Sequence, residues 1–370
     1  MKSKKRLVFV GGGHAHLTCL RRIGHFVNRG HHVTLISPSP YHYYSGMGSG
    51  MLSGIYQREE IRFNIKQMTE ESGGSFLQGT VTRVDPSSRL LLLDSGEEVN
   101  YDVVSFNTGS SVAIDRVAVK TEENVFTAKP IENLAKARQA ILDLIKNSKP
   151  QILVVGGGPT GLELAGNTWR LVQDHRGEAH ITLLAGSKLL SGLPAKVRDL
   201  AYQSLKARGI EVVEGSHLKR LESGQAIMED GHNYPFDLVF LALGVRASKL
   251  FRDSELPTGE DDGLMVNSYL QSVEHPEIFG GGDCISFQDR PLDKVGVYAV
   301  RENPILYDNL MAALEGGSLQ PFHPQDAYLL IFNLGDGKGI FWRKNWVFNG
   351  RLAFFIKDYI DRKFMRKFQV

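Results

Sequence analysis

Short apolar runs that end in glycine recur along the chain, and helical patterns of apolar positions follow two of them. Residues 6–37, RLVFVGGGHAHLTCLRRIGHFVNRGHHVTLIS, are predicted to form a strand, a glycine turn, a helix and a second strand. Residues 151–172, QILVVGGGPTGLELAGNTWRLV, and the run AHITLLAG after them repeat this order. Because strands that alternate with helices build parallel sheets, the pattern predicts an α/β protein with two such sheets.

Each repeat is followed by a predicted meander of short strands, in residues 74–110 and 209–248. Each meander returns to an apolar strand that runs into glycine, and HPEIFGGGDC supplies a third element of strand, glycine and aspartate. We therefore expect one domain to be inserted into another. The predicted boundaries are 1–115 with 266–325 for the first domain, 116–265 for the second, and 326–370 for a short C-terminal region.

Composition narrows the class of protein. The 370 residues are 42% hydrophobic and 23% charged with a net charge of +2, so no general basic excess points to nucleic acid. No apolar stretch is long enough to span a membrane, and two distant cysteines argue against a disulfide framework. These features predict a cytoplasmic protein. The last 33 residues carry nine Lys or Arg and two Asp, which predicts that this basic tail meets a partner.

The glycine turns have the spacing of dinucleotide-binding sites. The second turn has all three glycines of GxGxxG, at Gly156, Gly158 and Gly161, which allow a tight turn, a close approach of pyrophosphate and close packing of the helix. The first turn has Gly11 and Gly13, but His16 replaces the third glycine.

The first turn also raises two readings of its histidines. A metal pair, His14 with His16, has no nearby Cys or carboxylate in the sequence to complete it, so no metal is predicted. We instead expect His14 to donate a hydrogen bond to a pyrophosphate.

The position that normally supplies a ribose-binding carboxylate is not acidic in either unit. Ser37 occupies it in the first unit and Ala185 in the second, where Ser187 and Lys188 follow. A ribose 2′-phosphate is therefore admissible, and the choice between NADH and NADPH stays open.

The order GGGHAH, VTRVD, FNTGS, GGGPTGLELA, LALGVR and IFGGGDC resembles the two-dinucleotide-binding-domain flavoproteins of the pyridine nucleotide–disulfide oxidoreductase superfamily. The resemblance covers about residues 6–325 and implies two Rossmann-like domains, one for FAD and one for NAD(P)H. YHYYSGMGSGMLSG and the C-terminal region resemble the type II NADH:quinone oxidoreductase-like group, and are more similar still to the NADH-dehydrogenase-like domains found beside selenide, water dikinase.

The resemblance implies which residues bind each cofactor. For FAD they are Gly11, Gly13, His14, Ala15, His16, Ser37, Ser45, Gly46, Val81, Thr108, Gly109, Gly282, Asp283, Lys294 and Tyr298. For NAD(P)H they are Gly156, Gly158, Pro159, Thr160, Gly161 and Gly244. Glu163 is placed near the contact of nicotinamide and flavin, and Lys129 is expected to pair with Glu163 or to approach the flavin. These two are the predicted catalytic residues.

The sparse cysteines predict flavin chemistry without a redox-active thiol. We expect Cys19 to lie in the core and Cys284 to pack near the ribitol. The predicted reaction carries a hydride from NAD(P)H to flavin and electrons on to a quinone-like acceptor. Two alternatives stay open: a reductase of a soluble carrier such as a ferredoxin, and a redox-sensing flavoprotein with little turnover.

The tail combines apolar and basic positions at helical spacing. Leu352, Phe355, Ile356, Tyr359 and Ile360 form an apolar stripe beside several Lys and Arg, and Phe364 and Phe368 continue the stripe less regularly. Trp342 and Trp346 precede it. One reading is a helix that lies on an anionic membrane, at the inner face of the cell membrane. The other is a helix that docks its stripe on the flavin domain or on a second subunit, so a homodimer stays open.

Overall fold

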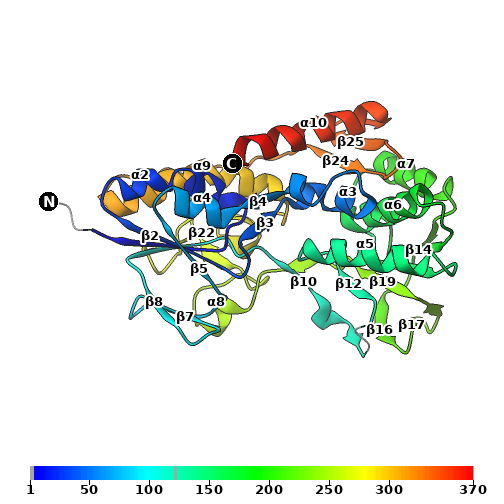
Figure 1. The fold of residues 1–370 in the computed structure, drawn as a ribbon, viewed down its shortest axis with the longest axis horizontal. Helices are drawn as coiled ribbons and strands as arrows, with labels where there is room; N and C mark the ends of the chain where they lie inside the picture. The colour runs from blue at the N-terminus through cyan, green and yellow to red at the C-terminus, as the bar shows by residue number, and fades with distance from the viewer. Residues whose placement is uncertain (1–3, 121–122, 370) are drawn as a thin grey trace.

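The computed structural model describes residues 4–120 and 123–369 of the protein. Figure 1 shows two lobes side by side, one at the left that contains the N-terminal strands and one at the right drawn in green. The C-terminal segment, in orange and red, lies along the upper edge of the view.

The first lobe is built on a sheet whose neighbouring strands are all parallel. In spatial order these strands are β22 (Ile278–Gly280), β9 (Val103–Phe106), β1 (Arg6–Val10), β2 (His32–Ser37) and β5 (Ser75–Gln78). Residues 7–10 of β1 are at most 3% exposed, as expected for a strand covered on both faces. Because the strands are parallel, the turns after β1, β9 and β22 meet at one edge of the sheet.

Helices cover one face of this sheet (Figure 1), namely η1 (His14–His16), α1 (Leu17–Arg21), α2 (Ile23–Val27), α4 (Ile65–Glu71) and α9 (Gly296–Glu315). Short elements cover the other face: β6 (Val81–Asp85), β7 (Leu90–Leu93), β8 (Glu98–Asn100) and α8 (Leu250–Asp253). The rings of Phe251 in α8 and Phe106 in β9 pack edge to face at 5.1 Å between centroids. An excursion between β2 and α4 holds β3 (Tyr41–Tyr43), η2 (Ser45–Met47), α3 (Gly48–Ser53), η3 (Glu59–Ile61) and β4 (Arg62–Asn64).

The second lobe repeats the plan with another parallel sheet. Its strands in spatial order are β12 (Val125–Thr127), β19 (Leu238–Leu241), β13 (Gln151–Val155), β14 (His180–Leu184) and β15 (Glu211–Val213). Its helices are α5 (Glu132–Leu144), α6 (Pro159–Asp174) and α7 (Ala195–Lys206). A small sheet joins β11 (Ala118–Val119), β16 (Leu218–Glu222), β17 (Gln225–Met228) and β18 (Asn233–Pro235). The two parallel sheets confirm the predicted α/β class.

The chain crosses between the lobes on a short antiparallel pair, β10 (Ser111–Val112) with β20 (Val245–Arg246). η4 (Ile114–Arg116) follows β10, and β21 (Leu264–Val266), η5 (Gly282–Cys284) and β23 (Ile285–Phe287) complete the first lobe. Helix α3 packs against both α5 and α6, so the excursion after β2 connects the lobes a second time. The expected domain boundaries stay predictions, and residues 121–122 lie outside the described chain.

The C-terminal region is an antiparallel sheet of β24 (Leu330–Asn333), β25 (Gly339–Arg343) and β26 (Trp346–Gly350), followed by α10 (Arg351–Phe368). It touches both lobes, because β24 packs on α6 while α10 contacts β4 and α1. The buried side of α10 is made of Ala353, Lys357, Asp361, Met365 and Phe368.

Most of the apolar stripe predicted in this helix faces the other way. Leu352, Phe355 and Tyr359 are 63%, 65% and 53% exposed, so this part of the stripe is not docked on the flavin lobe. Its continuation is docked there, because Phe364 and Phe368 pack against Phe63 of β4 at 6.1 and 6.4 Å between ring centroids.

Candidate functional site

Asn107, just after β9, holds the first glycine turn in place. A Cβ on Gly11, whose φ is +84°, would lie 2.4 Å from the Asn107 carbonyl oxygen, and a Cβ on Gly13 would lie 2.2 Å from the Asn107 Oδ1. Asn107 Oδ1 accepts a hydrogen bond from the Ala15 N–H at 3.0 Å, and Asn107 Nδ2 donates to the Gly281 carbonyl at 2.5 Å. One amide thus joins the turns after β1, β9 and β22, and sequence reasoning missed it.

His16, at the position of the missing third glycine, points into the core. Its Nδ1 lies 2.6 Å from the Gly11 carbonyl oxygen and its Nε2 lies 2.8 Å from Ser105 Oγ. Burial lowers the pKa of His16 to about 4, so the ring is neutral. His16 and Ala15 are fully buried and do not line the groove, and their contact with FAD stays a prediction.

His14 does line the groove, beside a second histidine. Its Nδ1 lies 3.1 Å from His42 Nε2, and its Nε2 has no hydrogen-bond partner among the described residues. Burial, helped by the charge of Lys129, lowers the pKa of His14 to about 4. The His14 side chain therefore faces the groove, whereas the His16 side chain faces the core. Among the described residues there is no group of three His, Cys, Asp or Glu that could hold a metal ion. The role of His14 at the pyrophosphate stays a prediction.

A groove of about 580 Å³ opens at the carboxyl edge of the first sheet. Many of the residues predicted to bind FAD line it, namely Gly11, Gly13, His14, Ser37, Ser45, Gly46, Val81, Thr108, Gly109, Gly282, Asp283 and Lys294. A Cβ on Gly11 or Gly13 would run into Asn107, so these two positions admit no larger side chain. The volume of the groove and its glycine-lined turn fit a dinucleotide such as FAD.

Lys129 pairs with Asp283 in the wall of this groove. Lys129 Nζ lies 2.7 Å from Asp283 Oδ2 and 2.9 Å from Ser110 Oγ, and the Ser110 hydroxyl donates to Asp283 at 2.8 Å. Burial opposes ionisation of Asp283, but the charge and hydrogen bond of Lys129 outweigh it and hold the Asp283 pKa below its usual value. The sequence predicts that Lys129 pairs with Glu163 or approaches the flavin. Within the described residues, the hydrogen bonds of Lys129 go to Asp283 and Ser110, not to Glu163.

The second glycine turn has the geometry that its spacing predicts. Gly156 has a φ of +130°, and a Cβ there would lie 2.3 Å from the Ala242 carbonyl oxygen. A Cβ on Gly161 would lie 1.8 Å from the Gly156 carbonyl oxygen, so this glycine lets α6 pack on the turn and does not line the cavity. Nothing lies within 4 Å of a Cβ on Gly158, which faces open space just before α6.

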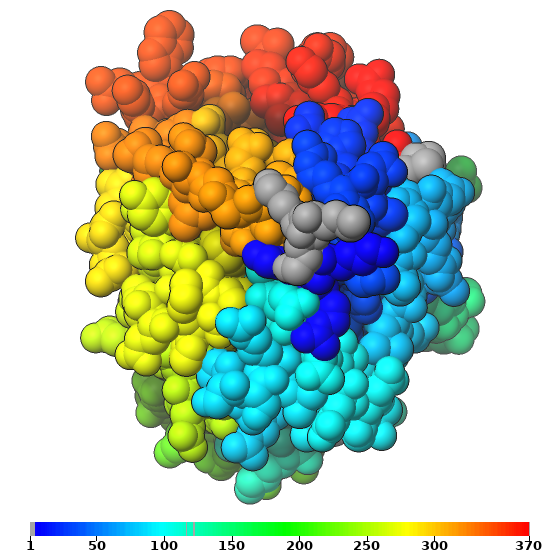
Figure 2. All heavy atoms as spheres, turned by 90° about the vertical axis from the view of Figure 1, so that its left-hand side faces the viewer, coloured from blue at the N-terminus to red at the C-terminus, as the bar shows by residue number. Residues whose placement is uncertain are grey.

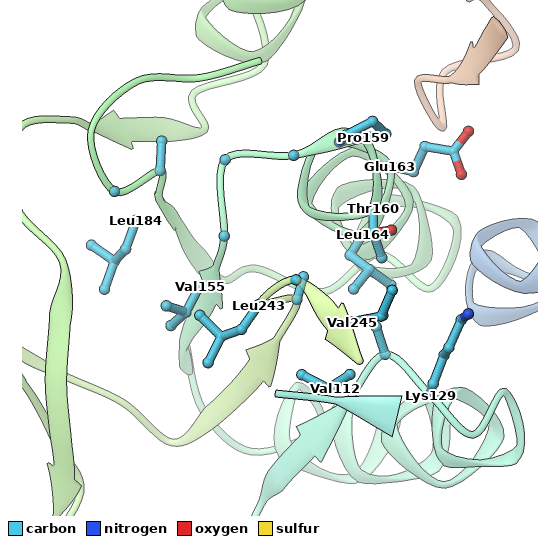
Figure 3. Close-up of a pocket in the computed structure, with 18 of the residues that line it drawn as sticks. Val112, Lys129, Val155, Pro159, Thr160, Glu163, Leu164, Leu184, Leu243 and Val245 are labelled. Carbon is cyan, nitrogen blue, oxygen red and sulfur yellow. The ribbon is translucent and has the colours of Figure 1, made fainter. Parts of the chain in front are cut away.

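A cavity of about 780 Å³ lies over this turn (Figure 3). The residues predicted for NAD(P)H that line it are Gly156, Gly158, Pro159, Thr160 and Gly244. Both predicted catalytic residues, Glu163 and Lys129, line it as well, at the right-hand end in Figure 3. The open backbone at Gly158, ahead of a long helix, fits a pyrophosphate.

The two cavities adjoin. Ser45, Lys129, Ile131, Thr160 and Lys294 line both of them. Lys294 is held by Asp261 at 2.7 Å and by the Ile285 carbonyl at 2.5 Å. Tyr298 lines neither large cavity, and its hydroxyl donates to the Gln325 carbonyl at 3.3 Å. Two elongated ligands, one in each cavity, would meet at the shared residues.

Glu163, in the second turn of α6, is fixed by groups from two other segments. Its Oε2 accepts from Ser49 Oγ at 2.8 Å, and its Oε1 accepts from the Asn333 N–H of β24 at 2.6 Å. Burial raises the pKa of Glu163, although the charge of Lys357 and these two hydrogen bonds act against the rise. Lys357 itself is buried, where Nζ pairs with Asp361 at 2.8 Å and donates to the Gly46 carbonyl at 2.7 Å.

Cys19 and Cys284 are free and fully buried. Neither lines the two cavities, although Cys284 directly follows Asp283 of the FAD groove, so its packing near the ribitol stays a prediction. Burial raises the pKa of both thiols, which disfavours the reactive thiolate.

Known proteins share the sequence pattern and the fold of this chain. The pattern of the pyridine nucleotide-disulphide oxidoreductase family matches residues 5–306. Ferroptosis suppressor protein 1 of Xenopus laevis is 25% identical over 360 residues, covering 90% of this chain and 87% of its own. The mitochondrial external alternative NAD(P)H-ubiquinone oxidoreductase B2 of Arabidopsis thaliana is 22% identical over 325 residues, covering 78% of this chain and 55% of its own.

Among solved structures, the sulfide:quinone oxidoreductase of Aquifex aeolicus superposes with a TM-score of 0.82 at 17% identity, over 99% of this chain and 91% of its own. This likeness confirms the predicted fold. The family match confirms the predicted superfamily and its cofactors, FAD and NAD(P)H.

Proposed function

Since the chain belongs to the pyridine nucleotide-disulphide oxidoreductase family, we propose that it oxidises NAD(P)H and passes the electrons through FAD to a quinone. FAD, when bound, accepts a hydride from nicotinamide and releases electrons to a second acceptor. The adjoining cavities support the first half of this proposal, because their shared residues bring two dinucleotides together without a thiol between them. Relatives named as NAD(P)H-ubiquinone oxidoreductases support the second half.

The observation that carries the choice of quinone is the outward apolar face of α10. Leu352, Phe355, Tyr359 and Ile360 are 42–65% exposed, whereas the charged pair Lys357 and Asp361 faces inward. A helix that exposes its apolar side and buries a charged pair is suited to an apolar partner. A membrane that contains a quinone is such a partner.

Basic residues around that face favour an anionic bilayer over a second protein. Arg343, Lys344, Arg351, Lys363, Arg366 and Lys367 are all exposed. Each basic residue near an anionic surface contributes about 1 kcal/mol, so this set adds several kcal/mol to the burial of the apolar side chains.

Trp346, 75% exposed in the hairpin before α10, has the character of an interfacial anchor. Figure 2 shows the C-terminal segment, in orange and red, along the upper rim of the molecule. Within the described chain no helix is both long and apolar enough to cross a bilayer. We infer peripheral attachment, at the inner face of the cell membrane.

Quinone reduction also needs protons at the acceptor. Conversion to a quinol takes up two electrons and two protons, of which the hydride supplies both electrons and one proton. Burial raises the pKa of Glu163 against the opposing hydrogen bond from the Ser49 hydroxyl, so this carboxyl can hold the second proton near the shared residues. Lys357, which donates to the Gly46 carbonyl, positions the loop that lines the FAD groove.

Rapid mixing without oxygen tests the proposal. NADPH or NADH should bleach the flavin, and a short-chain quinone should restore its absorbance over many turnovers. Restoration of the absorbance by an oxidised ferredoxin but not by quinone would favour a soluble partner. Bleaching without restoration by either acceptor would favour a redox sensor, and both results contradict the proposal.

A further inference from the structure

We propose that the pyridine nucleotide site prefers NADPH to NADH, with Lys188 and Ser187 receiving the ribose 2′-phosphate. This inference rests on the proposed function, because it names the electron donor of the same site.

The place of the adenosine ribose follows from the fold. In a dinucleotide-binding unit of this kind, the residue after the second strand lies beside the ribose 2′-position. That strand is β14, and the next residue is Ala185, which is 6% exposed and has no group to bond a ribose hydroxyl. Ala185 and Gly186 line the cavity, whereas the carboxylate typical of NADH sites is missing here.

The segment after Ala185 folds directly onto the pyrophosphate turn. The Leu190 N–H donates to the Gly157 carbonyl at 2.7 Å. A Cβ on Gly157 would lie 2.3 Å from the Ala185 carbonyl oxygen and 3.0 Å from the Lys188 carbonyl oxygen. The backbone of Lys188 is therefore fixed next to the turn that faces the nucleotide phosphates.

The nearest acid on the neighbouring strand is already occupied. Glu214, just after β15, accepts a hydrogen bond from the Leu189 N–H at 2.7 Å. Its two oxygens also lie 3.3 and 3.1 Å from Arg198 Nη2. Glu214 thus fixes the Lys188 segment, and it would have to break these bonds to reach a ribose hydroxyl.

Ser187 and Lys188 do not line the cavity themselves but directly follow Ala185 and Gly186, which do, and they are left free to bind an anion. Both are exposed, and within residues 4–120 and 123–369 the structure gives the Lys188 ammonium no hydrogen-bond or ion-pair partner. His217 lines the cavity beside Gly186, and Glu229 on the same wall is the carboxylate that acts against an anion. A phosphate dianion gains more from an unpaired ammonium than a ribose hydroxyl does.

Calorimetry on the FAD-loaded protein tests this preference with two probes, 2′,5′-ADP and 5′-ADP, which differ in the 2′-phosphate. We expect 2′,5′-ADP to bind at least about tenfold more tightly, which is about 1.4 kcal/mol. Lys188→Glu should remove at least that factor for 2′,5′-ADP and leave 5′-ADP unchanged. Lys206→Glu, at the far end of α7, makes the same change in net charge and should leave both affinities as they are.

Three results would overturn the inference: equal or tighter binding of 5′-ADP, no binding of 2′,5′-ADP, or an equal effect of the two lysine variants. The test is separate from that of the proposed function. If the reduced flavin gave no electrons to quinone while the preference for 2′,5′-ADP held, the choice of acceptor would be wrong and the assignment of Lys188 would stand.

Discussion

The ring of His16 turns away from the cofactor groove, although it occupies the place of the third glycine in the first turn. Its two nitrogens bond the Gly11 carbonyl and the Ser105 hydroxyl, so the bulky side chain fills core space and also fastens the turn to β9. A glycine at this position would leave the groove open because it has no side chain. The histidine leaves it open as well, because its side chain points into the core.

Glu302 is a buried acid whose protonation should be visible in stability. Burial raises its pKa to about 7, although the Gly282 N–H, which donates to Oε2 at 2.5 Å, favours the ionised form. The folded protein therefore holds this proton more tightly than the unfolded chain. The contribution of Glu302 to the free energy of unfolding is complete below pH 4.5, the model-compound value, and falls as the pH rises to about 7.

We expect Glu302→Gln to lose this slope. Compared with wild type, the change in unfolding free energy between about pH 5 and about pH 8 should differ by up to about 3 kcal/mol. His14 and His16, whose pKa values are lowered, reduce stability as the pH falls below 6.5, but they do so equally in both proteins. Urea unfolding at fixed FAD concentration measures the difference. Glu274→Gln, at an exposed glutamate, should follow wild type, and parallel curves for Glu302→Gln would contradict the assignment.

At the scale of elements, the three glycines between β13 and α6 have two different roles, since two of them allow close packing and one faces the ligand cavity. Gly156 and Gly161 are fixed by backbone atoms closer than 2.5 Å to their missing Cβ positions, whereas Gly158 has nothing within 4 Å. Gly156 and Gly161 make the turn, and Gly158 leaves room for the nucleotide.

We therefore expect Gly158→Trp to fold and to keep its FAD, because its φ of −81° suits any residue and the indole would extend into the cavity. It should lose NAD(P)H binding and flavin bleaching by at least about a hundredfold, or about 2.7 kcal/mol. The flavin spectrum and NADP⁺ titration report the two cofactors separately. Loss of both together would show that the second turn is only structural.

The elements that sequence reasoning located correctly are those with a local signature. Apolar strands running into glycine identified both parallel sheets and the Gly282–Asp283 turn. Contacts between distant residues could not be located in this way: Lys129 meets Asp283 across 154 positions, and Asn107 meets Gly281 across 174. In α10 the spacing predicted an apolar stripe, but its outward direction depends on Lys357 reaching Gly46, 311 positions away.

For the whole molecule, the C-terminal region connects the cofactor sites to one outer surface. β24 supplies the Asn333 N–H to Glu163, and α10 supplies Lys357 to the Gly46 loop and Phe364 to the ring of His14, with 5.8 Å between centroids. The opposite side of α10 carries the exposed apolar and basic residues. A membrane bound there would lie on the helix that contacts His14 and Gly46 of the flavin groove.

The most direct measurement is reoxidation of the NADPH-reduced protein, without oxygen, by a long-chain quinone dissolved in liposomes. We expect fast reoxidation with anionic liposomes, slower reoxidation at high salt because the basic residues are screened, and at least about a tenfold loss, or 1.4 kcal/mol, for a Leu352→Ser, Phe355→Ser variant. The same variant should still be reoxidised at the wild-type rate by a short-chain quinone in solution. A rate that does not depend on anionic lipid or on these two side chains, or no reoxidation at all, would contradict electron transfer to a quinone at this surface.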